Sequence, residues 1–392
     1  MESKRIKDIA ARIAPELIEI RQHLHQHPEL SFKEEQTSAF VKSKLADRGI
    51  AFDDGYAGTG IVAKVKGKAG GKQFALRGDM DALPIQEVND VAYRSTNPGV
   101  MHACGHDVHT SCALGAAFIL HELRDEWAGE AHIVFQPGEE VLPGGASLMI
   151  KEGALSNELQ GIVGQHVFPE LEAGKVGFRS GMYMASCDEL YFTVKGKGGH
   201  GALPHKNNDP VYATAQMVVA LQQIASRNAP PEVPTVLSIG RIIAEGATNV
   251  IPNEVQVAGT FRTLDEEWRS KAHGLIEQVA KSTCAANGVE VEVDIRKGYP
   301  FLINQPDLTA RAKKAAEDYL GSENVIDLDL RMTAEDFAYY SQHMAGCFYR
   351  LGTASANGEN RSAVHTPTFN IDESAIAVGT GLMAWIALTE LS

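Results

Sequence analysis

The segment Met101–His109 holds the densest group of side chains that could do chemistry. It places a thiol, three imidazoles and a carboxylate close together, on Cys104, His102, His106, His109 and Asp107. Soft and borderline ligands at this density favour zinc or a neighbouring transition metal. Histidines near a helix start are also often solvated or capping, so the C-x-H spacing alone does not establish a metal site.

A second candidate group is the carboxylate pair Glu139 and Glu140, which follows the apolar run Ala131–Phe135. Open α/β sheets place their sites at the carboxyl ends of strands, and adjacent residues that leave a strand can point to different sides. One carboxylate can therefore bind a metal while its neighbour acts as a general base, as metal-assisted hydrolysis requires. An acidic turn facing solvent would explain the pair equally well.

Four further residues complete the chemical inventory. His166 lies in the strand-like run GIVGQHVF and His365 lies in AVHTPTF. A histidine in an apolar strand needs a partner for its ring nitrogens, which can be a carbonyl, a carboxylate or a metal. Asp79 and Asp81 follow another strand end, where they could orient ligating imidazoles or cap a turn.

The elements that must position these residues alternate between helix and strand. Apolar residues recur at steps of three and four from Ile6 to Leu24, which predicts a helix that stops before Pro28. A second helix is expected over about 34–48, strands over 60–67, 72–80 and 131–137, and a helix over 107–125. This alternation predicts an α/β catalytic domain with a mostly parallel sheet.

The middle of the chain shows the order β-α-β-β-α-β, with helices expected over 209–225 and 265–288 between four strand-like runs. That order is typical of a ferredoxin-like α+β unit. We therefore expect a catalytic domain in two parts, 1–186 and 299–392, interrupted by an inserted domain over 187–298. The final apolar-striped helix is expected over 373–391.

Composition excludes several classes of protein. The 392 residues include 36 Lys and Arg against 50 Asp and Glu, a formal charge of −14, so a nucleic-acid partner is not expected. No apolar run approaches the ~20 residues of a membrane span, and the N-terminal residues lack the apolar core of a signal peptide. The five cysteines are scattered without close pairs, which favours free thiols and a reducing, cytoplasmic compartment.

Ten motifs, in order, resemble the aminoacylase and carboxypeptidase family of dinuclear-metal amidohydrolases. The resemblance is to the branch that contains hippurate hydrolases and plant indole-acetyl-amino-acid hydrolases. The matching motifs span residues 25–372: HQHPELSF, RGDMDALP, MHACGHDVHT, FQPGEE, GQHVFPEL, GKGGHGALPH, TNVIPNEV, GTFRT, AEDFAYY and VHTPTFNID. The resemblance implies a zinc-peptidase-type catalytic domain with an inserted lid or dimerisation domain.

The resemblance also implies a role for each matching residue. The implied metal ligands, with Cys104 bridging two ions, are Cys104, His106, Glu140, His166 and His365. Glu139 matches the general acid/base. Five protein ligands exceed what one open zinc site usually takes, and a bridged pair of ions distributes them sensibly. Asp79 stands where the wider family has a histidine ligand and is not assigned to the metal, whereas Asp81 and Asp107 are expected to lie behind the ligands.

In the inserted domain, His200 matches a histidine that reaches across a dimer interface to stabilise the oxyanion in the partner's active site. Asn249 and Arg262 match residues that hold the substrate's carboxylate. A donor is needed where the negative charge of a tetrahedral intermediate develops, and a guanidinium suits a bidentate grip on a carboxylate. The resemblance thus implies a homodimer formed through the inserted domain.

The implied reaction is hydrolysis of the amide of an N-acyl-L-amino acid to a carboxylate and a free amino acid. It would use two divalent metal ions, zinc or manganese in the first place and nickel or cobalt as alternatives. A metallo-dipeptidase or carboxypeptidase on the same fold is an open alternative. A binding protein that has lost the chemistry is a remote one, since all five ligand positions and Glu139 are present.

Overall fold

The computed structural model describes residues 2–392 and divides into two compact units. Unit 1 comprises Met1–Tyr183, Ile303–Leu330 and Asp336–Ser392, and unit 2 comprises Met184–Leu302 and Arg331–Glu335. The inserted domain expected over 187–298 falls within unit 2, which is wider at both ends. The short segment 331–335 was expected in the catalytic domain but clusters with unit 2.

Unit 1 is built on an eight-stranded sheet in the order β1-β2-β4-β3-β5-β16-β6-β15. Its strands are β1 (Ala51–Tyr56), β2 (Gly60–Lys66), β3 (Lys68–Asp79), β4 (Ala128–Gln136), β5 (Leu159–Glu172), β6 (Val176–Phe178), β15 (Val325–Asp327) and β16 (Gly346–Ala354). The central strands β4, β3, β5 and β16 pair in parallel with their neighbours. At one edge, β1 pairs antiparallel with β2, and β2 pairs antiparallel with β4. The central strands are apolar runs buried on both faces, as parallel strands require.

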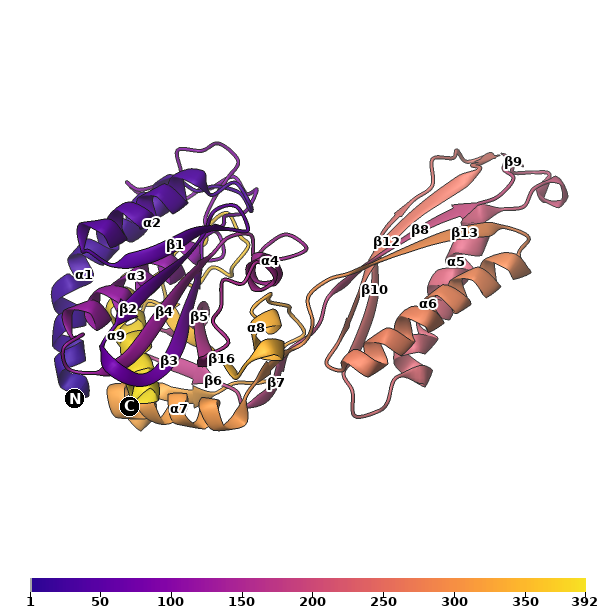
Figure 1. The fold of residues 1–392 in the computed structure, drawn as a ribbon. Helices are drawn as coiled ribbons and strands as arrows, with labels where there is room; N and C mark the ends of the chain where they lie inside the picture. The colour runs from indigo at the N-terminus through magenta and orange to yellow at the C-terminus, as the bar shows by residue number, and fades with distance from the viewer. Residues whose placement is uncertain (1) are drawn as a thin grey trace. The chain divides into compact units, whose positions relative to one another are not determined.

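Helices cover this sheet (Figure 1). They are α1 (Ser3–Gln26), α2 (Glu35–Asp47), α3 (His106–Glu122), α4 (Gly145–Lys151), α7 (Pro306–Leu320), α8 (Ala338–His343) and α9 (Ser374–Leu391), with a 3₁₀ turn η3 (Ser322–Asn324). Helix α1 ends before Pro28, as its sequence predicts, and buries the stripe that includes Ile6, Ile13 and Leu17. Helix α3 is buried almost along its whole length and packs between α1, α9 and the sheet.

The apolar helix α9 meets the length and composition of a membrane span, which the sequence analysis did not expect. In the structure 67% of it is buried inside the protein, where it packs against α1, α3 and α7. A helix that is apolar all round is expected either in a membrane or in the core of a large domain. The packing of α9 is that of a core helix.

Unit 2 is a four-stranded antiparallel sheet in the order β10-β12-β8-β13, layered against two helices (Figure 1). Its elements are β8 (Asp188–Lys195), α5 (Pro210–Leu221), β10 (Thr235–Ile243), β12 (Glu254–Thr263), α6 (Glu266–Ala286) and β13 (Glu290–Lys297), with short pieces β9 (Gly199–His200), η1 (Pro204–Lys206), η2 (Ile224–Asn228) and β11 (Val250–Ile251). The remaining strands, β7 (Gly181–Met184) and β14 (Leu302–Asn304), pair with each other. The order β-α-β-β-α-β and the ferredoxin-like strand order confirm the fold predicted for this segment.

Candidate metal centre

The start of α3 places the first two candidate ligands. Gly105 precedes the helix with φ 80°, and a Cβ at that position would lie 2.5 Å from the Val167 side chain. Only glycine fits both the left-handed backbone and the contact. The chain can therefore bend sharply between Cys104, which lies outside the helix, and His106, which opens its first turn.

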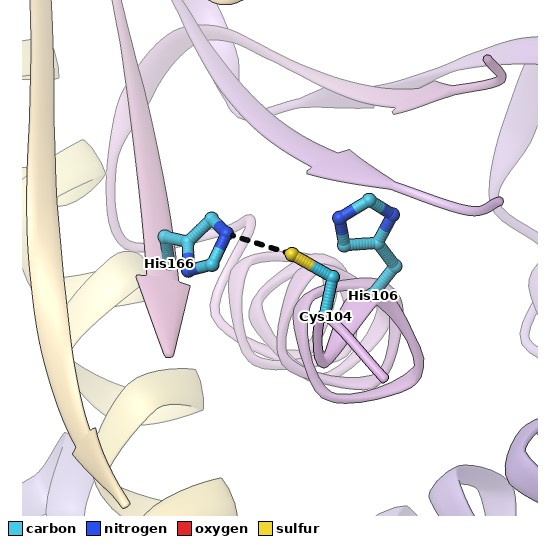
Figure 2. A group of neighbouring side chains, drawn as sticks. All are labelled: Cys104, His106 and His166. Atoms are coloured by element: carbon cyan, nitrogen blue, oxygen red, sulfur yellow. Dashed lines mark hydrogen bonds between the residues drawn. The ribbon is translucent and has the colours of Figure 1, made fainter. Parts of the chain in front are cut away.

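The first ligand group is formed by Cys104, His106 and His166, whose candidate ligand atoms lie within 4.8 Å of one another. Figure 2 shows the Cys104 thiol lying between the two imidazole rings. Cys104 Sγ is 3.4 Å from His166 Nε2, and His166 Nδ1 is 2.8 Å from the carbonyl oxygen of Val167. That second contact fixes the tautomer that leaves Nε2 without a proton and able to coordinate.

A second ligand group shares the same thiol and adds Glu140 and His365. His365 Nε2 lies 3.3 Å from Cys104 Sγ and 3.0 Å from Glu140 Oε1. His365 adopts a left-handed backbone conformation, with φ 63°, and its N–H donates to the carbonyl of Ala103 over 2.7 Å. The structure thus brings together all five residues that the sequence singled out as ligands, in two groups that meet at Cys104.

The electrostatics of the cluster favour a bound cation. Burial opposes a charged imidazole, but the carboxylates of Asp79 and Asp81 outweigh it and raise the pKa of His106 to about 10. Burial together with Glu140 and Glu139 raises the pKa of the Cys104 thiol well above its ordinary value. A divalent ion would relieve this excess of negative potential and favour the thiolate.

The donor set also fits a metal of the zinc type. His106 Nε2 is buried and has no hydrogen-bond partner within residues 2–392, although buried polar atoms normally have one. Burial, reinforced by the nearby Arg350 charge, keeps the pKa of His166 well below its ordinary value, so that imidazole is neutral. A thiolate, neutral imidazoles and a carboxylate are the ligands that zinc and its neighbours prefer.

The two carboxylates expected behind the ligands have different surroundings. Asp81 Oδ1 lies 3.1 Å from His106 Nδ1, and its Oδ2 accepts the Glu140 N–H over 2.9 Å. Asp107 points elsewhere, because its Oδ2 lies 2.8 Å from both Arg21 Nε and His25 Nδ1. In the described contacts Asp107 does not lie behind a candidate ligand, and that expectation is wrong. Because position 107 is one residue after His106 on the helix, its side chain faces α1.

Asp79 is compensated within the protein. Arg77 Nη1 donates to its Oδ2 over 2.5 Å, and His109 Nδ1 lies 2.6 Å from its Oδ1. Burial disfavours the ionised form, but Arg77 and the two histidines of α3 hold the pKa of Asp79 well below its usual range. This pairing is the physical reason to leave Asp79 outside the ligand set, as the sequence analysis did.

His109 contacts both a strand end and a neighbouring strand, a role that was not expected from the sequence. Its Nε2 accepts the N–H of Val167 over 2.9 Å, directly after the candidate ligand His166. Through its two ring nitrogens, His109 therefore connects Asp79, at the end of β3, with the backbone of β5. The spacing of three from His106 to His109, one helical turn, was the available signal that both rings share a face.

Glu139 and Glu140 meet different partners at the end of β4. The backbone N–H of Asp336 donates to Glu139 Oε1 over 3.3 Å, whereas Glu140 lies beside His365. Glu139 is buried, and its carboxylate lies within 4.8 Å of the candidate ligand atoms of His106 and Glu140. It is therefore placed next to the cluster, where a general base would be needed. Sequence reasoning missed Asp336, although AEDFAYY was among the matching motifs.

In unit 2 the structure brings His200 and Asn249 together. Strands β9 and β11 pair so that His200 lies opposite Val250, and the Gly201 N–H donates to the Asn249 carbonyl over 2.8 Å. Both side chains are exposed. Arg262 lies on β12, where its Nη1 donates to the Met332 carbonyl over 3.1 Å.

Comparison with known proteins decides the family. The model of "Peptidase family M20/M25/M40" matches residues 75–389. The chain belongs to this family. It is an M20-family hydrolase with the α/β fold and inserted domain that its sequence predicts, which confirms the family resemblance and the fold class.

Several M20 relatives are similar along most of their length. An N-acyl-L-amino acid amidohydrolase of Geobacillus stearothermophilus is 42% identical over 78% of this chain and 82% of its own. An N-acetyl-L-cysteine deacetylase of Bacillus subtilis is 40% identical over 92% and 85%. Thermostable carboxypeptidase 2 of Saccharolobus solfataricus is 35% identical over 98% of both chains.

A solved structure matches the whole fold. A Bacillus subtilis protein described as a dinuclear metal-binding peptidase of the M20 family superposes with a TM-score of 0.84 and 33% identity. The superposition covers 97% of this chain and 99% of that one. The M20 fold thus carries a pair of metal ions in a relative, and this chain has candidate groups of ligating residues of its own.

Proposed function

We propose that the protein is a metal-dependent amidohydrolase that cleaves N-acyl-L-amino acids into a carboxylate and a free amino acid. The observation that carries this proposal is the convergence of two ligand groups on Cys104, with the buried carboxylate of Glu139 beside them. The names of the amidohydrolase and deacetylase relatives support the substrate class.

The proposed metal centre holds two divalent ions. One ion would be held by His106 and His166, the other by Glu140 and His365, and Cys104 would bridge them because its thiol belongs to both groups. Zinc and manganese are the first candidates, and nickel and cobalt are alternatives, since availability decides as much as affinity. Elemental analysis should find two ions per chain and fewer in Cys104→Ser, whereas Cys112→Ala, at a buried cysteine of α3, should retain both.

Two bound ions would supply Lewis acidity toward a water molecule and the amide carbonyl. Glu139 would take a proton from the attacking water and return it to the leaving amine. The N–H of Asp336 holds Oε1 of Glu139 and so fixes the direction in which the carboxylate points. Unit 2 would supply His200 to the developing oxyanion, and Asn249 and Arg262 to the substrate's carboxylate.

We also propose a homodimer formed through unit 2, in which His200 serves the partner's site. Helix α5 exposes Val211, Tyr212 and Val219, the last with 74% of its surface accessible. In the same unit, the edge strand β10 exposes Ile242 and has an unpaired side in the sheet order. Exposed apolar side chains and a free sheet edge are both features that a second copy of the same unit could cover.

The cytoplasm is the proposed compartment. The five cysteines are free thiols, and four of them are buried. Free thiols persist in a reducing compartment.

A carboxypeptidase or dipeptidase is the second candidate, favoured by the carboxypeptidase relative. The two activities use the same metal centre and differ in what lies on the acyl side of the scissile amide. A free amino group there would need an acidic partner in the acyl pocket. A binding protein without chemistry is disfavoured by the presence of Glu139 and every candidate ligand.

The test is a substrate panel with metal-stripped protein and with samples restored with manganese or zinc. The panel contains N-acetyl, N-benzoyl and indole-acetyl amino acids together with dipeptides, and the readout is free amine. Metal-dependent release from the acyl compounds supports the amidohydrolase, and release from dipeptides alone supports the peptidase. No release from any compound by a protein that binds metal would contradict the proposed substrate class.

A further inference from the structure

Two buried carboxylates accept hydrogen bonds from the backbone of the turn that carries Glu139. The Gly138 N–H donates to Glu34 Oε1 over 2.9 Å, and the Glu140 N–H donates to Asp81 Oδ2 over 2.9 Å. The backbone donors on either side of Glu139 are therefore both fixed. Asp81 also contacts His106, so its place beside the metal centre is explained, whereas Glu34 touches none of the candidate ligands in the described contacts.

Glu34 is an unusual residue to bury. Its exposed fraction is 0%, and its carboxylate accepts two more hydrogen bonds, from the Phe32 N–H and the Thr59 hydroxyl, each over 2.9 Å. Burial and the nearby Asp81 charge raise the pKa of Glu34 to about 6. Burying a carboxylate costs free energy unless its hydrogen bonds are satisfied, so the position calls for an explanation.

Capping of α2 does not supply that explanation. Glu34 occupies the N-cap position of α2, but its side chain makes no capping bond to the helix. The capping bonds come from Glu29, whose two oxygens accept the N–H groups of Gln36 over 3.1 Å and Thr37 over 2.8 Å. Because another carboxylate satisfies the first turn, the Glu34 side chain is left to serve the Gly138 turn.

The same segment also shapes the turn sterically. Gly138 has φ 62°, and a Cβ there would lie 2.4 Å from the ring of Phe32. Phe32 itself has φ 63°, a conformation uncommon for a bulky side chain. The Phe32 ring and the Glu34 carboxylate thus contact the same glycine, one through packing and one through a hydrogen bond.

We propose that Glu34 is a positioning residue that fixes the Gly138–Glu140 turn and thereby aims the Glu139 carboxylate at the reacting water. The effect on catalysis rests on the proposed function of Glu139, whereas the fixing of the turn does not depend on it. Misplacing a reacting group by about 1 Å can cost ~10²-fold in rate. Loss of Glu34 should therefore lower kcat and leave KM and the number of bound metal ions nearly unchanged.

The test compares Glu34→Ala with Glu34→Gln and with the control Glu29→Ala. The glutamine side chain keeps an oxygen for Gly138 and Phe32, and its amide group can donate to Thr59. Glu29→Ala removes bonds to the same segment without touching the turn. We expect kcat of Glu34→Ala to fall about 10- to 100-fold, Glu34→Gln to restore kcat to within about threefold of wild type, and Glu29→Ala to lower thermal stability more than kcat.

A second readout keeps the two proposals separable. Amide hydrogen exchange of the peptide covering 134–142 should be faster in Glu34→Ala, near wild type in Glu34→Gln, and unchanged in Glu29→Ala. Wild-type exchange in this peptide for Glu34→Ala would overturn the positioning role, whatever the activity. Fast exchange with an unaltered kcat would overturn the link to Glu139. If exchange is fast in Glu34→Ala but the wild type hydrolyses none of the panel, the role of Glu34 in fixing the turn is supported and the proposed function is refuted.

Discussion

Asp81 Oδ1 lies 3.1 Å from His106 Nδ1, and the Nε2 atom on the other side of the same ring is buried without a hydrogen-bond partner in the described chain. The carboxylate thereby fixes both the tautomer and the direction of the imidazole. Its second oxygen holds the backbone of Glu140. One aspartate thus orders two candidate ligands from different parts of the chain, a helix start and a turn after a strand.

Asp81→Asn should weaken metal binding about 10- to 100-fold, the usual cost of losing a carboxylate behind a ligating histidine. The measurement is competition with a chromophoric chelator at fixed pH. Ser31→Ala is the matched control, because Ser31 contacts the same carboxylate through a single hydroxyl at 2.6 Å. Unchanged affinity in Asp81→Asn would show that His106 does not depend on this bond, or does not bind the metal.

Glu139→Gln should lower kcat about 10²- to 10⁴-fold, the range that general acid–base catalysis contributes. The metal content should stay at the wild-type level, because Glu139 is assigned to the proton and not to an ion. Glu140→Gln, the neighbouring change, should instead lower the metal content measured by elemental analysis. Hydrolysis at the normal rate by Glu139→Gln would refute the proposed base.

Acid should destabilise unit 2 through Asp188. This buried carboxylate accepts from Arg269 Nε over 3.0 Å and lies 2.6 Å from His273 Nε2. Burial raises its pKa, but His273 and Arg269 outweigh burial and lower the pKa to about 2. Because the folded pKa lies below the unfolded value of about 4, the stabilisation is present above pH 4 and is lost as pH falls from about 4 to 2.

That shift corresponds to about 2 kcal/mol in the free energy of unfolding. Asp188→Asn should be less stable at pH 7, because the buried Arg269 would keep only the partly exposed Glu266 as a carboxylate partner. Its stability should fall less steeply below pH 4. Urea unfolding at pH 7, 5, 4 and 3 measures both effects. Asp53→Asn, at an exposed carboxylate paired with Lys64, is the control, and an equally steep acid loss in Asp188→Asn would contradict the assignment.

Val219→Glu should convert a dimer into a monomer, because dimerisation through α5 would bury the new charge in an apolar interface. Light scattering after size-exclusion chromatography measures the mass. If His200 serves the partner's site, the monomer should lose activity to the same degree as His200→Ala. Lys281→Glu on α6 changes the charge elsewhere on unit 2 and should leave the mass unchanged. A fully active monomer would refute the role of His200 across subunits.

The sequence was informative wherever local patterns decide structure. The apolar period of α1, the stop before Pro28 and the β-α-β-β-α-β order of unit 2 all depend on neighbours along the chain. Elements in the region after Tyr299, including β16 and α7, were not resolved in advance. Helix α7 buries a stripe at helical spacing that includes Leu308, Ala312 and Tyr319, a local signal that was not used. Strand β16 is buried along its whole length against β5, which is distant in sequence, so it shows no alternation.

The amino-acid sequence by itself determined the family, the two-part fold and the chemical types gathered for a metal centre. Only the tertiary structure decided which carboxylate serves which partner: Asp81 turns to His106, Asp79 to Arg77 and His109, Asp107 to α1, and Glu34 to the Gly138 turn. Spacing along the chain gives the type and order of side chains. The direction of a buried carboxylate is set by the donors that surround it, and those donors come from segments that meet only on folding.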